Sequence, residues 1–260
     1  MKGTYPIILF LAGVFLATCG AADISESDAR KSERFYQAAY VAWFQEHNNL
    51  EAIRHLSRAV KADPNNDNAH YLLGTIRLGR SEYDLAEKHL RKALKLRDTS
   101  RPTQRVEVLN SMGVLLIHTR QLDEAVVLLK EASAEVLNRE PWLAMGNLGW
   151  AYIELGEYDK AVEILRLALF DQPLFCVGKF RLGEAYYHKG EYEMALASLE
   201  SAINITDGGC DQMQETHQLL GMTHLRIGNE ADARDAFERC REIDPTSEVG
   251  ANCAKTLAGL

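Results

Sequence analysis

The sequence predicts an all-α protein, built as a right-handed superhelix of six helix hairpins with a short capping helix at its C-terminal end. Three observations predict this fold. Small residues recur every 34 to 39 positions, alanine and leucine follow them at constant distances, and Pro64, Pro173 and Pro245 stand where second helices should end. Proline cannot continue a helix. We therefore assign the hairpin array to residues 33–246 and the capping helix to residues 247–260.

The repeat consists of four columns of small or apolar residues. The first column, occupied by a small residue in every unit but the first, contains Tyr40, Gly74, Gly113, Gly149, Gly183 and Gly221. Twelve residues later stand Ala52, Ala86, Ala125, Ala161, Ala195 and Ala233. Sixteen residues later stand Leu56, Leu90, Leu129, Leu165, Leu199 and Phe237, and nineteen later stand Ala59, Ala93, Ala132, Ala168, Ala202 and Cys240. Small residues let two helix backbones approach closely, and the large row fills the groove between them.

Two stretches show the repeat most clearly. Residues 147–152 (Asn-Leu-Gly-Trp-Ala-Tyr) are followed by 156–161 (Gly-Glu-Tyr-Asp-Lys-Ala), and residues 181–186 (Arg-Leu-Gly-Glu-Ala-Tyr) by 190–195 (Gly-Glu-Tyr-Glu-Met-Ala). This pattern resembles the tetratricopeptide repeat. The resemblance implies two antiparallel helices per unit, and such units bury their apolar faces only by stacking on one another.

Residues 1–18 have the pattern of a signal peptide. Their apolar stretch, residues 7–18, is too short to span a membrane as a helix. It ends in Leu-Ala-Thr directly before Cys19, which resembles the bacterial lipobox, and this resemblance implies that Cys19 is acylated. The alternative is plain secretion with an unmodified cysteine. Residues 19–32 are mostly small and polar, and we expect them to carry the acylated cysteine and a short tether to the scaffold.

The other four cysteines lie in the last third of the chain, at Cys176, Cys210, Cys240 and Cys253. An even number of cysteines in a secreted chain favours disulfides, and their spacing does not match a zinc site. In an antiparallel hairpin the first helix begins beside the end of the second, so we expect Cys176 to pair with Cys210. Cys240 and Cys253 face each other across a proline turn and form the second expected pair. The alternative is four buried thiols.

The first helices of such an array line its inner groove. Residues three before, one after and four after the small column share one stripe of the helix. Most of these residues are apolar or aromatic, and those that we predict to bind a partner are Val41, Phe44, Tyr71, Leu78, Val114, Ile117, Trp150, Ile153, Phe180 and Tyr187. Exposed apolar surface of this kind marks interaction sites. The alternative is that the stripe is additional core.

Charge and motif content argue against several function classes. The formal net charge is −8 without runs of lysine or arginine, so the chain lacks the electrostatic footprint of a nucleic-acid-binding protein. It contains no Ser/His/Asp arrangement, phosphate loop or HExxH motif, and we expect neither catalysis nor a cofactor. His188, His217 and His224 do not suggest a metal site, because the last two occupy positions that usually pack against the second helix.

A lipobox, a short tether, six tandem hairpins and late cysteines together resemble the type IV pilus biogenesis lipoproteins called pilotins, and in particular their myxobacterial members. This resemblance covers nearly the whole chain. It implies attachment to the periplasmic face of the outer membrane through the N-terminal lipid. It also implies binding of secretin subunits and promotion of secretin pore assembly.

From this resemblance we expect a monomeric lipoprotein whose groove covers an apolar segment of the secretin subunit. The alternative function is a scaffold for another envelope machine, such as a complex of cell-wall enzymes or the machinery that inserts outer-membrane proteins. Both functions require a protein partner and neither requires a chemical step.

Overall fold

The computed structural model describes residues 25–97, 102–206 and 209–260. This part of the chain contains thirteen α-helices and no strand. Twelve of them pair in chain order as six hairpins: α1 (Glu26–Phe44) with α2 (Asn49–Ala62), α3 (Asp67–Gly79) with α4 (Tyr83–Leu96), α5 (Pro102–His118) with α6 (Leu122–Ala134), α7 (Pro141–Glu154) with α8 (Tyr158–Asp171), α9 (Cys176–Lys189) with α10 (Tyr192–Ile203), and α11 (Gln214–Arg226) with α12 (Glu230–Ile243). The last helix, α13 (Glu248–Leu257), packs on α12. The predicted fold class is therefore confirmed.

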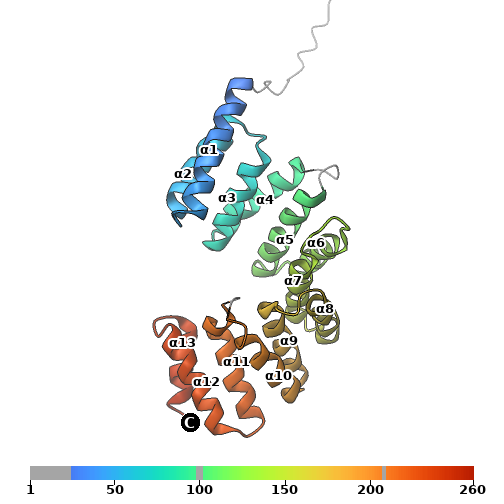
Figure 1. Ribbon diagram of the computed structural model, residues 1–260, viewed down its shortest axis with the longest axis vertical. Helices are drawn as coiled ribbons and strands as arrows, with labels where there is room; N and C mark the ends of the chain where they lie inside the picture. Colours follow the sequence, from blue (N-terminus) through green and yellow to red (C-terminus); the bar gives the residue numbers. More distant parts are fainter. Residues whose placement is uncertain (1–24, 98–101, 207–208) are drawn as a thin grey trace, which may run out of the picture.

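The hairpins follow one another in an arc, with α1 and α13 at its two ends (Figure 1). In the middle of the arc, α5 and α7 lie on the inner side and α6 and α8 on the outer side (Figure 1). Each hairpin contacts the next one, and consecutive first helices such as α5 and α7 also touch directly. The inner surface of the arc is thus built from first helices.

Small residues let the two helices of each hairpin approach closely. A methyl group added at Gly74, Gly113, Gly149, Gly183 or Gly221 would collide with the large side chain sixteen residues later. The alanines twelve residues after the small column are all fully buried, as are the residues nineteen after it. The predicted columns are therefore the packing surface that holds each hairpin together.

The first hairpin has one residue more in its turn than we predicted. The hydrogen bond that closes this turn spans six residues, from Asn48 N to Ala42 O, whereas the matching bond spans five residues in each of the other five hairpins. Helix α1 is therefore shifted by one residue relative to α2. Ala39, which is fully buried, occupies the small column, and Tyr40, which we predicted there, is 40% exposed.

Helix α1 also begins earlier than expected. Residues 26–32, which we predicted to belong to the tether, form its first turns. The Ser25 hydroxyl caps the helix by accepting the Asp28 N–H at 3.1 Å. The buried Ser32 hydroxyl donates to the Ala59 carbonyl of α2 at 2.9 Å. These contacts fix the segment on the first hairpin, so the described helix extends seven residues into the predicted tether.

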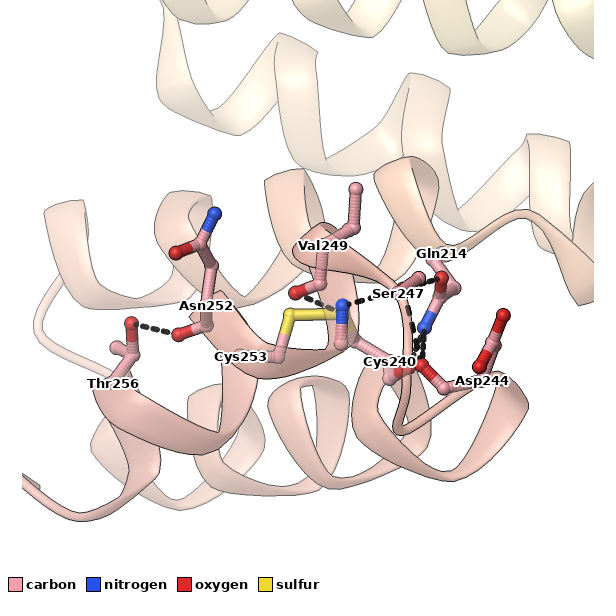
Figure 2. Close-up of a disulfide and its surroundings, with 9 residues drawn as sticks. Gln214, Cys240, Asp244, Ser247, Val249, Asn252, Cys253 and Thr256 are labelled. Carbon is pink, nitrogen blue, oxygen red and sulfur yellow. Dashed lines mark hydrogen bonds between the residues drawn. A yellow bond between two sulfur atoms is a disulfide. The ribbon is translucent and has the colours of Figure 1, made fainter.

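Two disulfides secure the C-terminal half of the array, in the pairing that we predicted. Cys176, at the start of α9, is bonded to Cys210, which follows α10. Cys240 of α12 is bonded to Cys253 of α13 (Figure 2). Beside this second bond, the Gln214 amide donates to the carbonyls of Cys240 at 2.7 Å and Asp244 at 2.8 Å (Figure 2). The capping helix is therefore held by a covalent bond and by a hydrogen-bonded turn.

Cys19 and the signal peptide lie outside the described residues, so the lipid anchor stays a prediction. None of the described helices has the length and apolar character needed to cross a membrane.

Candidate partner-binding groove

The first helices of the first four hairpins line a pocket on the inner side of the arc. Its volume is about 520 Å³, and residues from α1, α3, α5 and α7 line it. Helix α1 contributes Tyr36, Tyr40 and Trp43, which are spaced by four and three residues and so share one face. Helix α3 contributes Tyr71 and Thr75. The pocket thus has an aromatic wall, and of the residues that the sequence predicted for the groove it contains Tyr71.

The residues of α1 in this wall differ from those that we predicted. Because the first turn contains an extra residue, Tyr36, Tyr40 and Trp43 stand at the positions that correspond to Tyr71, Thr75 and Leu78 in α3. The predicted Val41 and Phe44 are exposed. The residues that correspond to Val41 in later hairpins, such as Ile76 and Leu115, are buried where one hairpin packs on the preceding one. No described hairpin precedes the first one, so Val41 has no such neighbour to pack against. Val41 and Phe44 therefore lie at the open end of the described array and do not line the pocket.

A buried arginine forms the floor of the pocket. The side chain of Arg97, which directly follows α4, is only 2% exposed. Its guanidinium donates to Asp67 Oδ2 at 2.9 Å, to Asn68 Oδ1 at 2.7 Å and to Glu107 Oε2 at 3.3 Å. Its guanidinium carbon lies 4.7 Å from the ring centroid of Tyr71. Two carboxylates thus surround this one cation, as the burial of a charge requires.

The tyrosine hydroxyls near this floor keep their protons at neutral pH. Burial raises the pKa of Tyr71 above its usual value, and the Glu107 carboxylate raises it further. Burial also raises the pKa of Tyr36, with a second contribution from the Glu33 carboxylate. Both hydroxyls therefore remain neutral donors, and the formal charge of the pocket comes from its carboxylates and its arginine.

Part of the predicted stripe is closed in the middle of the array, on α5, α7 and α9. Ile117, Ile153 and Phe180, which we predicted to bind a partner, are buried and belong to the core. Helix α7 contacts both α5 and α9 more extensively than α3 contacts α5 or α9 contacts α11. This part of the prediction is wrong, and the core interpretation holds for these three residues.

The remaining predicted residues are partly exposed. Val114 and Leu78 are half-buried, as is Tyr187. The Trp150 indole donates to Glu154 at 3.1 Å, and the Arg181 guanidinium lies 4.4 Å from the Trp150 ring centroid. Arginine thus covers the tryptophan in the structure. The open part of the groove is the aromatic pocket between α1 and α7.

His217 and His188 make contacts within the fold, whereas the buried Nδ1 of His224 has no hydrogen-bond partner among the described residues. His217 Nε2 lies 2.9 Å from the Asp211 carbonyl oxygen, and His224 is buried in α11. The exposed His188 ring stacks on Tyr158, with the ring centroids 5.3 Å apart. Across the described part of the chain, no three His, Cys, Asp or Glu side chains are arranged to hold a metal ion.

Sequence reasoning missed two features of this site. The arginine floor was not predicted, because Arg97 lies in a turn-rich segment outside the repeat columns. The aromatic residues of α1 were missed because the hairpins were aligned on Tyr40. The signal for the correct alignment was present in the alanine at position 39, which matches the small column better than tyrosine does.

The tetratricopeptide-repeat family matches three parts of the chain, residues 36–101, 116–174 and 178–246. The chain is also similar to the type IV pilus assembly protein PilF of Pseudomonas aeruginosa, with 27% identity over 169 residues, which are 62% of this chain and 64% of PilF. It is similar to the BBSome complex member BBS4 of Bos taurus, with 25% identity over 195 residues, 75% of this chain and 35% of BBS4. The chain therefore spans less than two thirds of each of these relatives.

Solved structures of similar shape include two pilus proteins. The crystal structure of PilW, a widely conserved type IV pilus biogenesis factor, superposes with a TM-score of 0.71 at 20% identity and covers 85% of this chain and 97% of PilW. The structure of PilF from Pseudomonas aeruginosa gives a TM-score of 0.66 at 22% identity, over 89% of this chain and 100% of that one. The Cut9–Hcn1 tetramer of APC/C gives 0.73 at 15% identity, over 89% of this chain and 43% of that one. At these identities the likeness establishes the fold.

Proposed function

The chain belongs to the tetratricopeptide-repeat proteins, and we propose that it is a pilotin. A pilotin is an outer-membrane lipoprotein that binds secretin subunits and promotes assembly of the secretin pore of type IV pili. The observation that carries this proposal is the sequence similarity to PilF, a type IV pilus assembly protein. The fold is typical of scaffold proteins that act by binding other proteins. The protein works without a chemical step and as a monomer.

The proposed anchor is the lipid on Cys19, at the periplasmic face of the outer membrane. The sequence before this cysteine supports the proposal through its similarity to a lipobox. A tether at one end of the array would leave the inner surface of the arc free to face a client chain. Holding the client close to the membrane raises its local concentration at the place where the pore assembles.

The proposed client site is the pocket between α1 and α7. Its aromatic wall and half-exposed Tyr40 supply the kind of anchor that dominates protein interfaces. An apolar segment of an unassembled secretin subunit would be covered there, which would suppress its aggregation until it meets other subunits.

This function is tested by complementing a deletion of the gene with the wild-type chain or with Tyr40→Lys. Secretin multimers are then measured by immunoblotting. An ammonium group in place of the ring removes the apolar contact, so we expect multimers to fall at least tenfold with Tyr40→Lys.

The matched control is Phe170→Lys, which places the same charge on α8, at a side chain that is 84% exposed. We expect normal multimers with this variant. Circular dichroism of both purified variants checks that the array remains folded. Normal multimers in the deletion strain itself would rule out a role in secretin assembly.

A further inference from the structure

We propose that the pocket recognises a lysine or arginine side chain of the partner polypeptide, placed against the aromatic wall of α1 and beside the carboxylates of Glu107 and Glu140. This inference rests on the proposed function, because it names the chemistry of the partner segment at the same groove. It predicts that the partner segment combines apolar residues with at least one positive charge.

The charges around the pocket favour a cation. Of the described side chains that line it, three carry a formal charge: Arg97, Glu107 and Glu140. Asp67, which does not line the pocket, pairs with Arg97, with Asp67 Oδ2 2.9 Å from Arg97 Nε. The two carboxylates and one guanidinium among the lining side chains leave a formal charge of −1 at the pocket. An acidic partner segment would therefore be repelled.

The one positive charge in the pocket is not available to an anion. Arg97 is almost completely buried, and its donors already face Asp67, Asn68, Glu107 and the Gln104 carbonyl at 2.8 Å. A carboxylate from a partner would have to displace one of these bonds. Glu107, in contrast, has a side chain that is 55% exposed and can accept further hydrogen bonds.

The aromatic wall supplies the second half of a cation site. Tyr36, Tyr40 and Trp43 line the pocket from one side of α1, and the Tyr40 ring stacks on Phe44 with the ring centroids 5.6 Å apart. The faces of tryptophan and tyrosine attract ammonium and guanidinium groups. The pocket already stabilises one guanidinium in this way, since Arg97 lies over the Tyr71 ring between two carboxylates. A volume of about 520 Å³ leaves room for a second long side chain and the backbone that carries it.

The probe for this site is a library of random twelve-residue peptides displayed on phage and selected on the full chain. We expect the selected peptides to be enriched in lysine or arginine and depleted in aspartate and glutamate. In the best binder, each arginine is then replaced by citrulline, which has the same shape without the charge, or each lysine by acetyl-lysine. We expect one such replacement to weaken binding at least fivefold in isothermal titration calorimetry.

Two variants locate the binding in this pocket. Glu107→Gln removes one carboxylate and keeps the side-chain shape, and Tyr40→Leu removes one ring and keeps an apolar residue. We expect each variant to weaken the peptide at least threefold. The control Glu163→Gln makes the same charge change at an exposed residue of α8 and should change binding less than twofold.

Three results would overturn the inference: a failure to select any binding peptide, a preference for acidic peptides, or equal affinity of the charged peptide and its neutral analogue. Unchanged affinity in both Glu107→Gln and Tyr40→Leu would also overturn it. The secretin multimer assay separates this failure from a failure of the proposed function. If Tyr40→Lys abolishes multimers while the peptides show no charge preference, the proposed function is supported and the cation site is refuted.

Discussion

At Gly113 the backbones of α5 and α6 come so close that a methyl group would collide with Leu129. Leu129 is itself fully buried and has no free space to move into. The same contact recurs at four other glycines, each facing the large residue sixteen positions later. A single hydrogen atom in place of a side chain therefore sets the distance between the two helices of a repeat.

The variant Gly113→Ala tests this contact. Alanine favours a helix over glycine by about 1 kcal/mol, but overpacking costs roughly 1–3 kcal/mol. We expect a net loss on the order of 1 kcal/mol in the free energy of unfolding, measured by urea denaturation. The control is Gly79→Ala in the last turn of α3, where nothing lies within 4 Å of the added methyl group. That variant should be neutral or slightly more stable, and equal effects at the two sites would refute the packing role.

At the scale of the helix pair, α3 and α4 are joined by buried His70 and partly buried His89. His70 Nδ1 lies 2.9 Å from His89 Nδ1, and His70 Nε2 lies 3.2 Å from the Pro64 carbonyl oxygen. Because that carbonyl can only accept, Nε2 of His70 carries its proton and the His89 Nδ1–H donates to His70. Burial lowers the pKa of His70, and burial together with the neighbouring His70 lowers the pKa of His89 to about 4.

This pair predicts a stability that depends on pH. Since the unfolded chain binds protons at a pKa near 6.5 and folded His89 at about 4, the unfolded state holds more protons between these values. The free energy of unfolding should therefore fall as the pH drops from 6.5 to 4, by at most about 3 kcal/mol from His89. In His89→Gln the fall should be smaller. Parallel pH profiles of the two proteins in thermal denaturation would contradict this prediction.

Hairpin turns show where sequence reasoning succeeds and where it stops. The positions of the helices follow from residues such as Gly149 and Leu165, because packing of this kind restricts which side chains fit. The register of α1 relative to α2 could not be predicted in this way. One extra residue in a polar turn leaves the apolar columns of α2 unchanged but shifts α1 by one position. Because of this shift, the residues of α1 that line the pocket are Tyr36, Tyr40 and Trp43, and the predicted Val41 and Phe44 do not line it.

At the scale of the whole molecule, the arc has two unlike halves. The C-terminal half carries both disulfides, and the predicted groove residues Ile153 and Phe180 are buried in it. The pairing of these cysteines could be predicted, since antiparallel geometry brings the start of α9 to the end of α10. The N-terminal half keeps an open pocket whose floor depends on Arg97. That residue's partners come from α3 and α5, and no repeat column predicts contacts between such distant segments.

The most direct measurement of the central claim is site-specific cross-linking in living cells. A benzophenone amino acid is placed at position 40 in the pocket or at position 170 on α8, and adducts are identified by mass spectrometry. If the N-terminal pocket holds the client, a secretin subunit should be cross-linked at position 40 and not at position 170. A secretin adduct at position 170 alone, or none at position 40 in cells that assemble the pore, would contradict the claim.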